Sequence, residues 1–246
     1  LSLGGSSSPS VLTGSGLNDT VLGGSAGDTL DGGSGSDSIV GGAGADAIVF
    51  AANDATVNAG GGVDTLLIRE ATADFTSVLA GGGTVASKFS QFEALDMRNG
   101  DSNTLTLNAA SVAALTQGGS TSTVTINGDG TDNLIRTDSW TASGSPQLLN
   151  GVAYRTYTNG GLTLKVSTDI NLLSPQLGTT SSDTLTGVAS GNEFFDAGAG
   201  DDVISAGAGN DVLRGGAGND TLDGGADADT VDYSDNSNPV IINLGT

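Results

Sequence analysis

The stretch GGSGSDSIVGGAGADAIV, residues 32–49, decides the fold because it is one nine-residue unit written twice. Each unit joins a glycine-rich turn to an aspartate and places an apolar residue two positions after the acid. The acid register extends in both directions, with only Ala55 breaking it, through Asp19, Asp28, Asp37, Asp46 and Asp64. The apolar register runs through Val21, Leu30, Ile39, Ile48, Val57 and Leu66. A fixed short period of this kind predicts a repeat solenoid.

A second block near the C-terminus repeats this scheme. Its registered acids are Glu193, Asp202, Asp211, Asp220 and Asp229, and its apolar positions are Phe195, Ile204, Leu213, Leu222 and Val231. Asp183 and Leu185 extend the block with one extra residue inserted. The sequence therefore predicts three segments, namely repeats over 11–69, a β-rich insert over 70–175 and repeats over 176–246.

Each unit predicts half of a coil. Paired glycines permit positive φ and let the turn curl with its carbonyls pointing inward, and the triplet around the apolar position is a short strand. Two units make a coil of 18 residues, so acids 18 positions apart stack on one edge, about 4.8 Å from each other. The predicted stacks are Asp19 with Asp37, Asp28 with Asp46, Asp46 with Asp64, Glu193 with Asp211, Asp202 with Asp220, and Asp211 with Asp229.

The negative charge of the stacked acids indicates what they must bind. The 246 residues carry a formal charge of −21, which works against binding to nucleic acid and to anionic membranes because both would repel the chain. We expect no nucleic-acid partner. Two carboxylates about 5 Å apart repel by roughly 3 kcal/mol at an effective dielectric near 20, and several pairs rival a domain's stability of about 5–15 kcal/mol. We therefore expect bound cations. Calcium accepts six to eight oxygen ligands, whereas zinc and softer metals lack their usual ligands because the chain has no histidine or cysteine.

The repeats resemble the RTX (repeats-in-toxin) nonapeptide G-G-x-G-x-D-x-U-x over roughly residues 13–67 and 178–232. The resemblance implies a parallel β-roll, a right-handed β-solenoid, with several Ca²⁺ ions between turns and export by a type I secretion system. It assigns the registered acids, Asp183 included, as carboxylate ligands. It assigns turn carbonyls to Gly32, Gly33, Gly35, Gly41, Gly42, Gly44, Gly207, Gly209, Gly215, Gly216, Gly218, Gly224 and Gly225.

Some repeat acids and two units depart from the pattern. FAANDATVN, residues 50–58, lacks both glycines and the registered acid, which puts the site beside Asp37 in doubt, and Glu193 replaces aspartate in VASGNEFFD, residues 188–196. Acids at outward strand positions are expected to be solvated surface; they are Asp31, Asp196, Asp223 and Asp232.

The insert contains strand-like runs separated by turn signals, namely FEALDM, NTLTLNA, STVTING, DNLIRT, VAYRTYT and LTLKVS. NAASVAALTQ predicts a helix capped by Asn108. The segment is similar to those that interrupt the repeats of large RTX adhesins. No run of about 18 apolar residues predicts a membrane span.

Three groups of side chains in the insert are of types that can take part in catalysis, metal binding or sugar binding. Glu93 and Asp96 are expected to be surface acids, because they point to opposite faces of a strand. GDGTDN, with Asp129 and Asp132, is similar to half of a calcium loop. The aromatic residues Trp140, Tyr154 and Tyr157 are expected to pack rather than to form a sugar platform. Without histidine or cysteine, no catalytic site is predicted.

Three functional hypotheses remain open at this point. The first is a calcium-binding structural module of a secreted, extracellular or cell-surface protein, such as an adhesin or surface-layer protein with a cell-surface glycan or other ligand. The second is a calcium-dependent module of a secreted hydrolase or epimerase, and the third is a carbohydrate-binding module in the insert. The chain begins at Leu1 without a methionine or a signal stretch, so we expect it to be part of a longer polypeptide.

Overall fold

A computed structural model describes residues 1–2, 6–77, 83–119, 122–188, 191–233 and 241–243. It divides into two compact units, Leu1–Asn171 and Leu172–Thr246. Within the described residues, no helix is long and apolar enough to cross a membrane.

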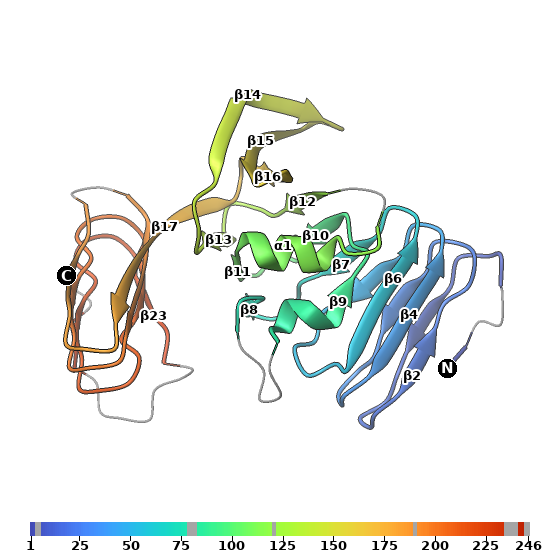
Figure 1. Cartoon of the computed structure of the whole chain (residues 1–246), viewed down its shortest axis with the longest axis horizontal. Coiled ribbons are helices and arrows are strands. Elements are labelled where there is room, and N and C mark those ends of the chain that lie inside the picture. The colour runs from blue at the N-terminus through green and yellow to red at the C-terminus, as the bar shows by residue number, and fades with distance from the viewer. Residues whose placement is uncertain (3–5, 78–82, 120–121, 189–190, 234–240, 244–246) are drawn as a thin grey trace. The chain divides into compact units, whose positions relative to one another are not determined.

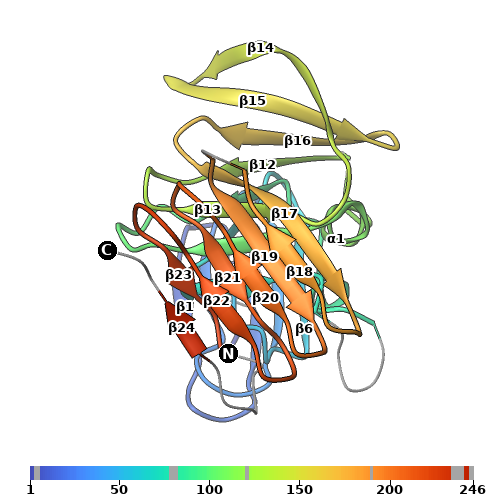
Figure 2. The same cartoon turned by 90° about the vertical axis from the view of Figure 1, so that its left-hand side faces the viewer.

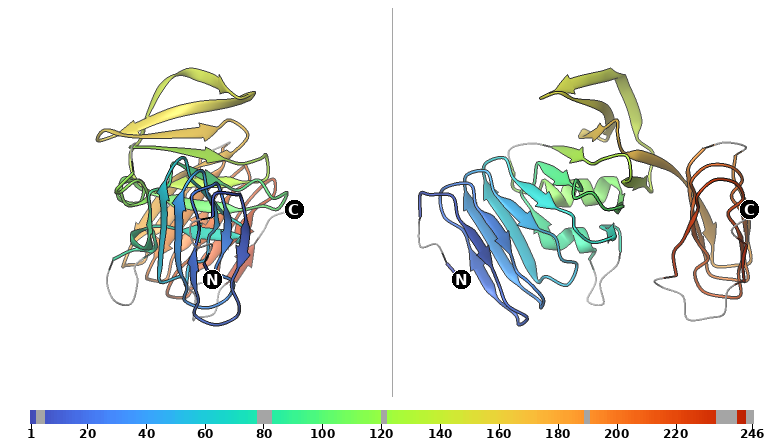
Figure 3. Two further views of the ribbon diagram at one scale, coloured as in Figure 1. Left: turned by 90° about the vertical axis from the view of Figure 1, so that its right-hand side faces the viewer. Right: turned by 180° about the vertical axis from the view of Figure 1, so that it is seen from behind.

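The first unit begins with a roll in which successive strands alternate between two parallel sheets (Figures 1 and 3). One sheet contains β1 (Val11–Thr13), β3 (Thr29–Asp31), β5 (Ala47–Val49) and β7 (Thr65–Leu67). The other contains β2 (Thr20–Leu22), β4 (Ser38–Ala43), β6 (Thr56–Gly61) and β9 (Phe89–Ser90). Leu30 pairs with Leu12 and Ile48, so the coil has the expected 18 residues. The expected parallel β-roll is confirmed.

The insert extends this roll with longer coils. Its elements are β8 (Thr72–Asp74), η1 (Val85–Lys88), β10 (Ala94–Asp96), β11 (Thr104–Leu107), α1 (Ala109–Leu115), β12 (Thr123–Asn127), β13 (Asn133–Arg136), β14 (Thr141–Leu149), β15 (Val152–Asn159) and β16 (Leu162–Ser167). Strands β10, β12 and β16 continue the sheet of β7 in parallel, and β8, β11 and β13 form a further parallel set. Strands β14, β15 and β16 form an antiparallel meander (Figure 1).

The wider coils of the insert enclose a larger apolar core than the repeats do. Phe50, Phe75 and Phe89 are buried, with ring centroids 5.0–5.8 Å apart. Helix α1 packs against η1 and β9 at this core. As the sequence predicts, Asn108 caps α1, because its side-chain oxygen accepts the Ser111 N–H at 2.8 Å.

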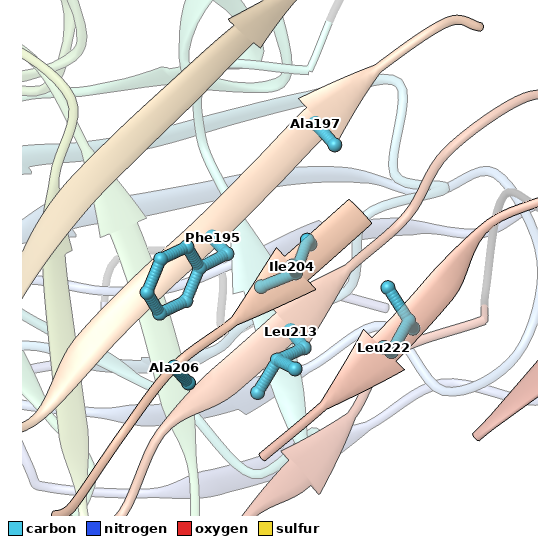
Figure 4. Close-up of a cluster of buried hydrophobic side chains, with 6 residues drawn as sticks. All are labelled: Phe195, Ala197, Ile204, Ala206, Leu213 and Leu222. Atoms are coloured by element: carbon cyan, nitrogen blue, oxygen red, sulfur yellow. The ribbon is translucent and has the colours of Figure 1, made fainter. Parts of the chain in front are cut away.

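The second unit is another parallel roll (Figure 2). One sheet has β17 (Asn171–Thr179), β19 (Glu193–Gly198), β21 (Val212–Arg214) and β23 (Thr230–Val231). The other has β18 (Thr184–Thr186), β20 (Val203–Ser205), β22 (Thr221–Asp223) and β24 (Ile241–Asn243). The interior holds a cluster of buried apolar side chains, drawn in Figure 4: Phe195, Ala197, Ile204, Ala206, Leu213 and Leu222.

Replacing Leu95 by alanine tests the continuity of the insert with the roll. Leu95 is fully buried between Leu66 and Ile126, so Leu95→Ala should lower the free energy of unfolding at saturating calcium by about 2–5 kcal/mol. Urea unfolding measures this. The control Leu148→Ala, at a side chain on β14 that is 77% exposed, should change it by less than about 0.5 kcal/mol. Equal effects of the two substitutions would contradict the packing.

Candidate metal centre

The registered acids stand immediately before the strands, and most of them are buried. Asp37 precedes β4 and Asp46 precedes β5, and the structure buries both carboxylates. The other buried members of the register are Asp28, Asp64, Glu193, Asp202, Asp211 and Asp220. Asp19, Asp183 and Asp229 are half-buried. Buried carboxylates need partners, so the contacts of their oxygens decide what the arrangement can do.

In most of these acids, one carboxylate oxygen joins two coils through a main-chain hydrogen bond. In the first unit, Oδ1 accepts the N–H of the acid one coil earlier, at 2.7 Å for Asp19–Asp37, Asp28–Asp46 and Asp46–Asp64. In the second unit, the bonds are 2.8–3.1 Å for Asp183–Asp202, Glu193–Asp211, Asp202–Asp220 and Asp211–Asp229. Asp183 and Asp202 are 19 positions apart because of the inserted residue. We call each such stack a carboxylate ladder.

The second oxygen of most ladder acids is buried and makes no hydrogen bond within the described residues. These atoms belong to Asp37, Asp46, Asp64, Glu193, Asp202, Asp211, Asp220 and Asp229. Each unsatisfied buried group costs about 1–3 kcal/mol, and more when it is charged. The total is comparable to the whole stability of a domain, which is about 5–15 kcal/mol. The ladders therefore require a ligand with positive charge.

Burial and mutual repulsion also change the acidity of the ladder. Burial raises the pKa of Asp46 and Asp64, and the neighbouring ladder carboxylates raise the pKa of both further. In the second unit, burial followed by like charge raises the pKa of Glu193, Asp202 and Asp211. The fold thus disfavours the charged form of these five carboxylates, which is the form that they adopt in water at neutral pH.

The glycine turns leave room for an ion beside these oxygens. A Cβ built on Gly32 would lie 2.4 Å from Asp37 Oδ2, and one on Gly224 would lie 2.3 Å from Asp229 Oδ2. A carbonyl oxygen of the next coil lies in the same space, since a Cβ on Gly41 would lie 2.1 Å from the Ala59 oxygen and 2.6 Å from Asp46 Oδ2. No group of three or more histidine, cysteine, aspartate or glutamate side chains gathers in the described part of the chain. Oxygen ligands from one or two carboxylates and several carbonyls fit calcium.

The predicted turn glycines occupy these coils. Positive φ occurs at Gly33, Gly35, Gly42, Gly44, Gly207, Gly209, Gly216, Gly218 and Gly225. Each of the remaining four glycines lies against the second carboxylate oxygen of the aspartate in its own nine-residue repeat; they are Gly32, Gly41, Gly215 and Gly224. Their assignment as carbonyl ligands remains a prediction.

Asp19 and Asp183, the first acids of two ladders, are different. Asp19 Oδ2 accepts the N–H and the hydroxyl of Ser15, and the main-chain bond, as the larger cause, lowers the pKa of Asp19. Asp183 Oδ2 accepts the same two groups of Thr179. These two oxygens have protein partners, in contrast to those inside the ladders.

Two expectations about surface acids are wrong. Glu93 is half-buried, and its Oε2 accepts the Asp64 N–H at 2.9 Å, so Glu93 is the next member of the ladder. The 29-residue spacing hid it from the nine-residue register. Asp196 and Asp232 are not simply solvated, because both form ion pairs with Arg214, at 3.7 and 2.7 Å.

The other candidates of the insert have partners within the protein. Asp132 is buried, and its two oxygens accept the N–H groups of Asn103 and Asp129. Tyr154 and Tyr157 are each 6% exposed, and the Arg136 guanidinium lies 4.3 Å from the Tyr157 ring centroid. The aromatic residues thus pack, as the sequence predicts.

In the presence of a chelator, lowering the pH should partly replace calcium in folding the protein. The folded-state pKa is raised for Asp46, Asp64, Glu193, Asp202 and Asp211, so the folded state binds more protons than the unfolded state as these groups titrate. Folding is therefore favoured as pH falls from neutral toward the ordinary carboxyl values of 3.8 for aspartate and 4.5 for glutamate. Far-UV circular dichroism in chelator should show β structure increasing over this range. A β signal that falls steadily with pH would contradict the proton linkage.

Comparison with known proteins agrees with this geometry. The model of the RTX calcium-binding nonapeptide repeat matches four copies in the chain, at residues 13–48, 188–220, 196–231 and 209–237. None of the curated proteins compared with the chain matches it. The matched residues include the ladder acids from Asp19 to Asp46 and from Glu193 to Asp229. These two blocks are thus RTX calcium-binding nonapeptide repeats, and the repeats bind several Ca²⁺ ions.

Proposed function

We propose that this chain is a calcium-stabilised structural module of a large type I secreted surface protein, such as an adhesin or a surface-layer protein. The supporting observation is the set of buried ladder oxygens without protein partners. The calcium-binding segments would be 11–69 and 176–246, and 70–175 would be the insert. The carboxylate ligands would be the registered acids from Asp19 to Asp64 and from Asp183 to Asp229, with turn carbonyls from the glycines named above.

The mechanism would couple folding to binding. At submicromolar calcium inside a cell, the repulsion within the ladders would keep the repeats unfolded and suitable for export. At millimolar calcium outside, bound ions would neutralise the ladders and bring the turns together, because a ligand that binds only the folded state stabilises it by mass action. The chain would thus act as a rigid part of a longer, extracellular polypeptide.

Two other functions have less support. A calcium-dependent module of a secreted hydrolase or epimerase would share this geometry, and the sequence that flanks the chain would discriminate. For a carbohydrate-binding module, Tyr154 and Tyr157 are mostly buried and offer little ring surface for stacking a sugar. A glycan or other adhesin ligand remains a part of the adhesin hypothesis.

A calcium titration of the chelated chain tests the proposal. Far-UV circular dichroism should show a cooperative gain of β structure with a midpoint between micromolar and millimolar calcium. Magnesium at the same concentrations should not produce it, because Mg²⁺ demands a tighter octahedral geometry. A chelated chain that already shows the full β signal would overturn the coupled-folding mechanism.

A further inference from the structure

The unit that breaks the repeat, FAANDATVN at residues 50–58, carries a buried acid one position away from the register. Asp54 is 1% exposed, and neither of its carboxylate oxygens makes a hydrogen bond within the described residues. The match to the repeat family ends at residue 48, so the comparisons assign Asp54 no role.

Main-chain hydrogen bonds explain how Asp54 comes close to the acid position of the repeat, which in this unit holds Ala55. The Ala55 and Thr56 N–H groups both donate to the Asp37 carbonyl oxygen, at 2.7 and 3.3 Å. Thr56 nevertheless pairs with Ser38, so the strand keeps its 18-residue register. The turn stacks on the preceding one as well, since the Asn53 side-chain amide donates to the Gly35 carbonyl oxygen. The irregular unit thus stays within the roll.

Asp54 lies close enough to Asp37 for the two charges to interact. Burial, and after it the Asp37 carboxylate, raise the pKa of Asp54 to about 7, although the Asp37 main chain and Lys88 act to lower it. Lys88 does not form an ion pair with Asp54, because its Nζ donates instead to the Ala52 carbonyl oxygen at 2.8 Å. Asp37 Oδ2 is also buried and unpaired. Three buried carboxylate oxygens therefore lack a partner at this point of the roll.

We propose that Asp54 and Asp37 hold a calcium ion between the turns at 32–37 and 50–54, with Asp54 replacing the acid that the register lacks. This inference rests on the proposed calcium-dependent folding. A carboxylate is needed there because the turn at 50–54 has no glycine to bring its carbonyls inward. The first ladder series would then continue across the irregular unit without a gap.

The test counts bound ions by equilibrium dialysis and measures the calcium midpoint of folding by circular dichroism on the full chain. Asp54→Asn keeps the size of the side chain and removes its charge. It should lose one bound ion per chain and shift the midpoint to higher calcium. The control Asp101→Asn, at an exposed loop acid, should change neither value.

A shift of the calcium midpoint in the opposite direction would overturn the proposal. If Asp54 is only a buried charge that repels Asp37, Asp54→Asn relieves the repulsion, keeps the ion count and shifts the midpoint to lower calcium. Failure of the wild-type chain to bind calcium would instead contradict the proposed function itself.

A second variant leaves Asp54 intact and decides the case if Asp54→Asn does not fold. Lys88→Met removes the positive charge that lowers the pKa of Asp54. If Asp54 binds calcium, this loss removes a competing charge and shifts the midpoint to lower calcium. If Lys88 is what neutralises Asp54, the same substitution leaves a buried charge without compensation and shifts the midpoint to higher calcium, which overturns the proposal.

Discussion

The structure depends on the hydrogen bond between the main-chain N–H of one registered acid and the carboxylate of the acid one coil later. This bond, near 2.7 Å in the first roll, fixes the distance between coils and the direction of each carboxylate. It also leaves the second oxygen turned into the glycine turn, buried and without a protein partner. The interaction that builds the roll therefore creates the charge that only a bound cation can balance.

The two rolls and the insert are stabilised by different means. Most strands of a roll bury one large apolar side chain, such as Leu30 or Ile204, which gives too little apolar area to offset the ordering of nine residues. The insert buries an aromatic cluster around Phe75 and a helix beside it, and so contains an ordinary hydrophobic core. The proposed dependence of folding on calcium would therefore be a property of the repeats, where turns and carboxylates take the place of a core. This division would suit the proposed export of an unfolded polypeptide that folds when it meets calcium.

Regular spacing determined what the sequence could predict. The parallel roll, the 18-residue coil and the ladder acids follow from the nine-residue period, because each position of the unit has one structural role. Glu93 and Asp54 were missed for the same reason. A coil of 29 residues brings Glu93 into the ladder, and an irregular turn buries Asp54 near Asp37, at positions that no fixed period reaches. The ion pairs of Arg214 with Asp196 and Asp232 were also missed, although all three lie 18 positions apart on one face. The capped helix α1 was predicted because its signal is local.

Hydrogen exchange of the ladder N–H groups tests the central claim most directly. The main-chain amides of residues 28, 46, 202 and 211 donate to carboxylates rather than to strands, so their protection reports the ladder itself. Protection of these amides should be strong in calcium and lost in chelator, while amides in the core of the insert keep part of theirs. Equal protection of the ladder amides in chelator and in calcium would contradict the claim that the ladders need a bound cation.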